Sequence, residues 1–534
     1  MTTKSQPTGI STRGTQPSWT RRSLLGALGS GVLASSVGTL ATTSRRPSLP
    51  KCAGSRASPH QRIDAHLHVF NGTDLQIAGF LKRSVAPEYP TVAPLLKLIA
   101  DPLQTFVWAF SPTAEGELKR LNGLTNPKAE GKGFLPENTA SALALDNAET
   151  DAQYAQFLLE QFQREDVRAA LGDILLRGRR DAPALLPRLK QAPRTPTEAR
   201  ALAGDADRAG GIPIFDYLSR YFSYRYANFF AAIEQFTCRD LPPIDTFVAL
   251  MVDFDEPLAP GTETKSRISQ QTTVVSKICE LSRGRLVALA PYCPFKDLAR
   301  HGASLKNVTE AWTKPGFVGA KIYPPMEFKP FDNGQPLDGA LASFYHECIR
   351  HDAVVAAHAG PSLCIDSGPC DAPGPPGWQK ALDYVLKAEK APLRVNLGHY
   401  GGVLGDDARS TKWPEGFLAL MAKPSGERLY ADLGYSSQVL KSSNDKYAIQ
   451  RLSDLLTSSG SALPSRLLYG SDWLMLGLES RWRNYTQRMQ TVIQGVEQKT
   501  GMNGLGLRLF GGNARRWLGL ESTGSLASRN TVSL

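Results

Sequence analysis

Short apolar runs alternate with longer amphipathic segments along most of the chain. Continuous apolar runs predict buried strands, and apolar positions at helical spacing predict helices that cover them. Eight such runs occur, at 62–70, 245–254, 287–294, 317–323, 354–359, 394–399, 429–435 and 466–473. Helical patterns follow most of them, as at 266–282, 337–350, 378–390, 415–423, 445–458 and 480–499. This alternation predicts an α/β protein with a parallel sheet.

Eight strand–helix units favour a closed (β/α)8 barrel, a TIM barrel, over residues 61–520. An open, doubly wound sheet is the alternative. Such a sheet calls for a glycine-rich phosphate turn after its first strand, and the segment 66–72 (HLHVFNG) is not one.

The first unit of the barrel carries a long insertion, 73–240, in place of a short connection. Its pattern is mostly helical, for example at 140–170 and 217–236, with segments rich in Pro and Gly between the helices. Because the insertion follows the first strand, it leaves the barrel at the face where active sites lie, and we expect it to cap the pocket. The tail, 521–534, is expected to be unstructured.

The net charge of +11 on the 534 residues is concentrated in the leader, 1–60, which holds eight Lys or Arg residues and no Asp or Glu. The nearly balanced remainder offers no broad basic surface for nucleic acid. Arg21 and Arg22 precede a weakly apolar stretch, which resembles a bacterial twin-arginine signal. That resemblance implies export by the twin-arginine machinery to the periplasm or another extracytoplasmic site. No stretch is long and apolar enough for a stable membrane span.

The seven cysteines include no CxxC pair, which argues against a zinc ribbon or a thioredoxin-type motif. Cys364 and Cys370 lie in one loop. A disulfide between them and two free thiols are both open.

Histidine and aspartate side chains stand where the predicted strands end. His66 and His68 lie on the first strand, His358 and His399 end two later apolar strands, and Asp472 ends the last. Residues two apart on a strand share a face, so the first pair can enter the barrel together. In a closed barrel the eighth strand neighbours the first, which brings Asp472 beside that pair. Imidazole and carboxylate groups gathered in this way suit a divalent transition metal.

This set resembles the amidohydrolase superfamily of metal-dependent barrels, and most closely the amidohydrolase-related family, which includes aminocarboxymuconate-semialdehyde decarboxylase. The stretches that carry the resemblance are IDAHLH at 63–68, FVGAKIYPP at 317–325, LRVNLGHYGG at 393–402, LYGSDW at 468–473 and GNARRWL at 512–518. The resemblance covers about 62–520, except for the insertion.

The resemblance implies roles for these residues. His66, His68, His358 and Asp472 would bind one divalent ion, most often zinc in that family. His399 would act as an acid or base, or as a ligand at a second site. Asp472 would also accept a proton from water.

Three further residues are expected to contact the substrate. Lys321 lies on the fourth strand, where a carbamylated lysine bridges two metal ions in some members. It can instead bind a substrate carboxylate or pair with an internal acid. Tyr323 and Trp473 either line the pocket or pack above it.

The expected function is metal-dependent hydrolysis of a small-molecule amide, ester or lactone through activated water. Non-oxidative decarboxylation of an unsaturated or aromatic acid is the alternative within the same superfamily, and a non-catalytic exported binding protein is the alternative from another class. The substrate and the oligomeric state stay open, with a homodimer as one option.

Overall fold

Eight parallel strands form a single sheet whose order follows the chain. The computed structural model describes residues 61–521 and 525–530, except for 125–135, 178–184, 211–212, 240–242, 368–369 and 406–407. The strands are β1 (Ile63–Leu67), β2 (Thr246–Leu250), β3 (Leu286–Pro291), β4 (Phe317–Ile322), β5 (Val354–His358), β6 (Val395–Gly398), β7 (Leu429–Asp432) and β8 (Leu467–Leu468). The proposed twin-arginine leader lies outside the described residues.

The sheet closes on itself between its first and last strands. The backbone N–H of Ala65 donates to the Tyr469 carbonyl at 2.9 Å, and Leu67 pairs with Trp473 in a parallel bridge just beyond β8. The predicted eight-stranded parallel barrel is therefore confirmed.

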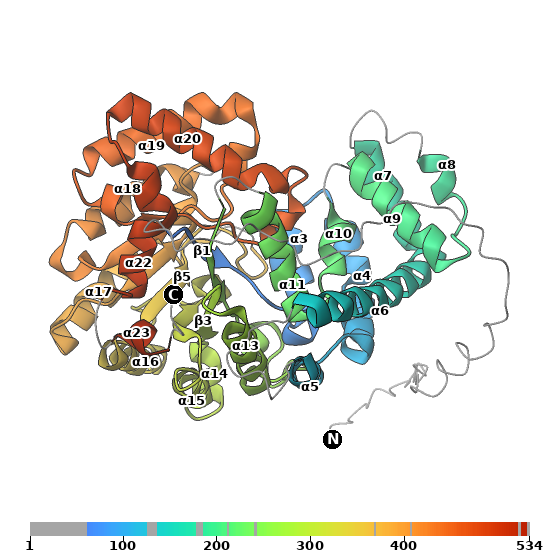
Figure 1. Cartoon of the computed structure of the whole chain (residues 1–534), viewed down its shortest axis with the longest axis horizontal. Helices are drawn as coiled ribbons and strands as arrows, with labels where there is room; N and C mark the ends of the chain where they lie inside the picture. Colours follow the sequence, from blue (N-terminus) through green and yellow to red (C-terminus); the bar gives the residue numbers. More distant parts are fainter. Residues whose placement is uncertain are drawn as a thin grey trace, which may run out of the picture. The chain divides into compact units, whose positions relative to one another are not determined.

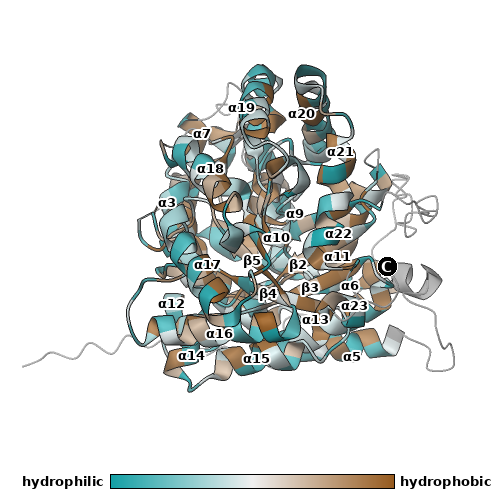
Figure 2. Ribbon diagram, turned by 90° about the vertical axis from the view of Figure 1, so that its left-hand side faces the viewer, coloured by the Kyte–Doolittle hydropathy of each residue, from teal (hydrophilic) through white to brown (hydrophobic). Residues whose placement is uncertain are grey.

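Helices surround the barrel on its outer face (Figure 1). They are α12 (Asp255–Leu258), α13 (Ile268–Ser282), α14 (Pro294–Ala299), α15 (Ala303–Ala311), α16 (Leu337–His351), α17 (Pro375–Glu389), α18 (Ala408–Met421), α19 (Asp445–Ser458), α20 (Tyr485–Thr500) and α22 (Asn513–Leu518). Figure 2 shows strands β3 and β4 as mainly hydrophobic and the helices around them as amphipathic. This arrangement accounts for the alternation of apolar runs and amphipathic segments in the sequence.

A buried apolar cluster joins side chains of the strands to helix α22. This cluster includes Val248, Leu250, Leu289, Val354 and Trp517, all with almost no exposed surface. The polar site residues lie at the carboxyl ends of the strands, where the active sites of such barrels are found.

The insertion after β1 is helical, as expected, and its main helices lie to one side of the barrel in Figure 1. They are α4 (Ala93–Phe110), α5 (Ala114–Leu124), α6 (Pro136–Gln163), α7 (Glu165–Arg177), α8 (Leu186–Leu189), α9 (Pro196–Gly210), α10 (Ile214–Ser219) and α11 (Arg225–Ala232). Shorter pieces lead in and out, namely η1 (Gly72–Asp74), α2 (Ile77–Gly79), η2 (Phe80–Val85), α3 (Ala86–Glu88) and η4 (Ile233–Arg239).

Two predicted helices of the insertion are interrupted in the structure. The pattern at 140–170 spans two helices that meet at Arg164, whose guanidinium donates to the Leu98 carbonyl. The pattern at 217–236 is broken by a turn at 220–224, where the Tyr221 carbonyl accepts from the Gly72 N–H at 2.8 Å. At both breaks, polar groups form hydrogen bonds with segments that are distant in the sequence. The local pattern of apolar residues does not reveal such contacts.

The expectation that the tail is unstructured is wrong for its later described residues. Leu526–Asn530 form helix α23. The Asn530 side chain donates to the carbonyls of Trp312 and Phe317, both at 2.8 Å. These bonds hold the helix beside the start of β4, a tertiary contact that the short and weakly patterned segment does not indicate. No helix in the described part of the chain combines the length and apolar character needed to cross a membrane.

Candidate metal centre

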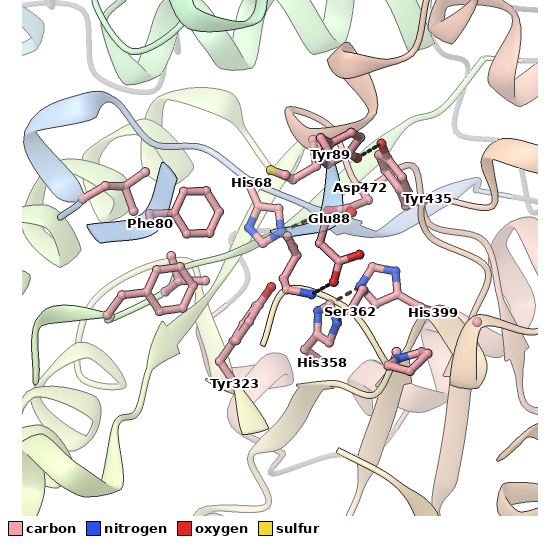
Figure 3. A pocket seen from close by; sticks show the side chains of 18 of the residues that line it. His68, Phe80, Glu88, Tyr89, Tyr323, His358, Ser362, His399, Tyr435 and Asp472 are labelled. Carbon is pink, nitrogen blue, oxygen red and sulfur yellow. Dashed lines mark hydrogen bonds and ion pairs between the residues drawn. The ribbon is translucent and has the colours of Figure 1, made fainter. Parts of the chain in front are cut away.

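The five expected site residues come together at the carboxyl ends of β1, β5, β6 and β8. In chain order they are His66, His68, His358, His399 and Asp472. The Asp472 Oδ1 atom lies 3.1 Å from His68 Nε2 and 3.6 Å from His66 Nε2. His399 Nε2 lies 3.1 Å from His358 Nδ1. Figure 3 shows four of these side chains around one pocket.

Donor atoms of His66, His399 and Asp472 all lie within 4.8 Å of one another. Among the described residues, Asp472 Oδ1 is buried and has no hydrogen-bond partner of good geometry. His399 and Asp472 adopt φ values of +67° and +56°. Residues other than glycine rarely adopt such angles, and functional sites are where they cluster. The backbone is therefore shaped to aim these two side chains into the site.

Each of three imidazoles is oriented by a partner at its Nδ1 atom. His66 Nδ1 donates to Asp432 at 3.0 Å, His68 Nδ1 to the Leu250 carbonyl at 2.7 Å, and His399 Nδ1 to the Gly434 carbonyl at 3.0 Å. A proton held at Nδ1 leaves the Nε2 lone pair available, and the Nε2 atoms are the ones that face the site. Metal-binding histidines are commonly oriented in this way.

Asp432, at the end of β7, was not among the residues expected from the sequence. Its carboxylate also accepts from the Asn396 side chain at 2.7 Å and from the backbone N–H of His399 at 3.1 Å and Gly434 at 2.8 Å. Burial acts to raise the pKa of Asp432, but the neighbouring His66 and His399 lower it well below its usual range. A sequence signal existed, because Asp432 lies within the apolar run of β7 much as Asp472 lies within that of β8.

Burial also keeps the imidazoles of His66 and His358 neutral. It lowers the pKa of His66 to about 4, although Asp432 and Asp472 act to raise it. Burial lowers the pKa of His358 well below its ordinary value too, and the nearby His399 and Lys321 act in the same direction. Neutral imidazole is the form that binds a metal ion.

Glycines make room for His66. A Cβ atom on Gly398 would lie 2.9 Å from His66 Cε1, one on Gly434 would lie 3.0 Å from Nδ1, and one on Gly470 would lie 2.7 Å from its Cβ. None of the three has a left-handed φ angle. Their lack of a side chain is therefore explained by close approach to His66 and not by backbone conformation.

We expect Gly470→Ala to destabilise the protein, because the new methyl group would meet a buried strand residue that cannot move aside. Overpacking of this kind costs about 1–3 kcal/mol. Thermal unfolding measures the loss. Gly123→Ala, in helix α5, is the matched control, since its Cβ would have no neighbour within 4 Å. Equal melting temperatures for the two variants would contradict the steric role of Gly470.

A cavity of about 200 Å³ opens onto the site. The insertion supplies part of its wall, and the loops after the strands supply most of the rest. Its lining includes Leu75, Phe80, Glu88 and Tyr89 from the insertion, and Phe70, Val252, Phe254, Tyr323, Leu363, Tyr435 and Met475 from the barrel and its loops. The expected capping of the pocket by the insertion thus agrees with the structure.

The three expected substrate-contacting residues are placed differently from one another. Tyr323 lines the cavity. Lys321 does not, and its buried amine has no hydrogen-bond partner among the described residues. Burial lowers its pKa to about 8, although Asp432 and Asp472 act to raise it. Trp473 also lies outside the lining and packs on Trp482 at 4.4 Å between ring centroids. Its position does not fit the expected substrate contact, because neighbouring aromatic rings enclose it.

The loop after β5 is held by a disulfide between Cys364 and Cys370. Of the two states that the sequence left open, the structure has the bonded one. The loop begins with Gly360, Pro361, Ser362 and Leu363, which line the cavity. The disulfide therefore restricts a segment of the pocket wall.

Residues 292–520 match the family model described as Amidohydrolase. The matched segment is less than half of the chain. It contains His358, His399 and Asp472, whereas the β1 pair lies before it. A search of curated proteins gives no significant match.

Solved structures similar to this chain include two of an amidohydrolase from Burkholderia multivorans. The one with bound HEPES has a TM-score of 0.34 and 15% identity, and the one with bound zinc has 0.33 and 14%; both matches cover 52% of this chain and 83% of the other. Amidohydrolase 2 from Bifidobacterium longum subsp. infantis has a TM-score of 0.23 and 16% identity, with coverage of 38% and 62%.

Proposed function

We propose that this protein is an amidohydrolase that binds one divalent ion and hydrolyses an ester, lactone or amide bond of a small molecule. The observation that carries the proposal is the convergence of His66, His68 and Asp472. Two Nε2 atoms approach one buried carboxylate oxygen, which accepts no hydrogen bond of good geometry from any described residue. Nitrogen and carboxylate donors in this combination fit zinc.

We assign His66, His68 and Asp472 to the ion, together with one imidazole of the His358–His399 pair. The facing nitrogens of that pair are 3.1 Å apart. The other imidazole then serves as an acid or base beside the substrate. His358 Nε2 also lies 3.3 Å from the Ser362 hydroxyl, so a proton can pass along this row.

In hydrolysis, water adds to the carbonyl carbon and the bond to the leaving oxygen or nitrogen breaks. The Asp472 carboxylate is placed to take the proton that water loses, and the leaving group must receive a proton in exchange. A divalent ion would supply Lewis acidity and would activate water at neutral pH. Asp432 holds the His66 ring in place throughout, through its contact with Nδ1.

Metal analysis with activity assays tests the proposal. We expect about one divalent ion per purified chain, loss of ester, lactone or amide hydrolysis after chelation, and recovery when zinc is added back. We expect His68→Ala to purify with much less metal, because one of the donor nitrogens is removed. His346→Ala, at an exposed histidine paired with Glu389 on the outside of the barrel, is the matched control.

Other outcomes separate the alternatives. Release of carbon dioxide from unsaturated or aromatic acids without hydrolysis would favour a decarboxylase. Bound metal without turnover of esters, lactones, amides or acids would favour a binding protein. Equal metal content in His68→Ala and the wild type would overturn the assigned centre.

A further inference from the structure

One wall of the cavity is a continuous row of aromatic rings. Phe80, from the insertion, stacks on Phe254 with ring centroids 5.6 Å apart and an interplanar angle of 18°. Phe254 meets Tyr323 edge to face at 4.8 Å, and Tyr323 lies 4.7 Å from the His358 ring. All four side chains line the cavity. The row therefore leads from the capping insertion to the proposed metal centre.

The cavity offers apolar contacts and few charged ones. Phe70, Leu75, Val252 and Met475 add to its apolar lining. Among the described lining residues, the carboxylic acids are Glu88 and Asp472, and none of those residues is Lys or Arg. A substrate with an additional carboxylate would thus meet side chains of its own sign and no lysine or arginine.

The Tyr323 hydroxyl is the polar group available within the aromatic wall. It forms no hydrogen bond to any described residue, and in Figure 3 it points into the pocket between His68 and His358. A phenol carries its proton at neutral pH. A neutral hydroxyl in this position can donate a hydrogen bond to a substrate oxygen, where negative charge develops during hydrolysis.

We infer that the substrate is an uncharged molecule with a single flat, unsaturated ring, whose ring packs against Phe80, Phe254 and Tyr323 and whose scissile carbonyl oxygen accepts a hydrogen bond from the Tyr323 hydroxyl. This inference rests on the proposed hydrolytic function. A cavity of about 200 Å³ suits one ring with a short ester, amide or lactone group. Contact between aromatic rings adds specificity beyond the area that is buried.

Matched esters test the ring and the charge. We expect the metal-loaded full chain to hydrolyse benzyl acetate with a kcat/KM about tenfold above that for cyclohexylmethyl acetate, whose leaving group has similar reactivity but no flat ring. For 4-carboxybenzyl acetate we expect a kcat/KM at least about 100-fold lower than for benzyl acetate. On binding, its carboxylate gives up its hydration water and meets no lysine or arginine side chain among the described lining residues. Equal values for the three esters, or a preference for the carboxylate, would overturn the inference and leave hydrolysis itself established.

Two variants test the contribution of the aromatic wall and that of the Tyr323 hydroxyl independently. Phe254→Leu keeps an apolar side chain but removes a ring, so the preference for benzyl acetate should fall to about twofold or less. Phe331→Leu is the control, because Phe331 stacks on Tyr384 outside the cavity.

Tyr323→Phe should lower kcat for benzyl acetate about 100-fold with KM, metal content and ring preference unchanged. Tyr384→Phe is its control, and similar kcat values for the two tyrosine variants would remove Tyr323 from the proposal.

If none of the esters is hydrolysed, the proposed ester hydrolysis is contradicted. Recognition of a flat ring can then still be tested by a binding measurement. Benzohydroxamic acid and cyclohexanecarbohydroxamic acid carry the same metal-binding group and differ in ring flatness. By calorimetry we expect the first to bind the metal-loaded protein about tenfold more tightly, and Phe254→Leu to remove the difference. Equal affinities in the wild type would overturn the aromatic wall as a recognition element, whatever the reaction.

Discussion

Replacement of Asp472 by asparagine should lower kcat by about 10²- to 10⁴-fold, the range expected when a positioned general base is lost. Asparagine keeps the shape of the side chain but cannot take a proton from water at neutral pH. It also removes the negative charge that lies 3.1 Å from His68 Nε2 and 3.6 Å from His66 Nε2. Steady-state kinetics at saturating zinc measure the loss of proton transfer, and metal titration measures the loss of affinity separately.

Asp454→Asn provides the matched control for that variant. Asp454 is exposed on helix α19, where it accepts a hydrogen bond from Gln450. Its replacement should leave kcat unchanged. An Asp472→Asn enzyme that binds zinc and retains kcat within threefold of the wild type would exclude Asp472 as the proton acceptor.

Arg225→Met should destabilise the protein by about 3–5 kcal/mol, the cost of breaking a buried ion pair by removing one partner. The Arg225 side chain is completely buried, and it donates to Asp74 at 2.7 Å and to Glu117 at 2.8 Å. Although burial acts to lower it, these two carboxylates raise the pKa of the guanidinium. Methionine fills part of the same volume but leaves both acids buried without a cation.

The expected loss is measured by thermal and urea-induced unfolding of the full chain. Arg350→Met is the control, because Arg350 forms its ion pair with Glu347 on an exposed face of α16 and such pairs contribute at most about 1 kcal/mol. Since Asp74 lies in η1, Glu117 in α5 and Arg225 in α11, the network ties three segments of the insertion together, and Asp74 immediately precedes the cavity residue Leu75. Unfolding of Arg225→Met at the wild-type temperature would mean that this network is dispensable.

Much of the barrel could be predicted from the sequence because its strands are buried on both faces. Such strands are read as continuous apolar runs, and seven of the eight lie wholly inside a predicted run, while β3 begins one residue earlier. Closure of the barrel then implied that Asp472 lies beside His66 and His68, and the structure places them so. The bends within the insertion were missed, since contacts with distant residues determine them.

The candidate site was only partly predictable for a related reason. Side chains that can hold a metal ion stand out by type, whereas groups that orient them do not. Leu250 and Gly434 act through backbone carbonyls, which every residue possesses. Asp432 could have been noticed at the end of its strand, but its contact with His66 joins residues 366 positions apart and becomes visible only in three dimensions.

The barrel carries the proposed metal-binding residues and the insertion carries part of the cavity wall, and this separation has an evolutionary consequence. Every residue assigned to the ion belongs to the barrel, whereas Phe80 and three further cavity residues belong to the insertion. Substitutions in the insertion can therefore change which molecules fit while the reactive centre stays intact. Relatives that share the barrel and differ in this segment are expected to carry out the same chemistry on different compounds.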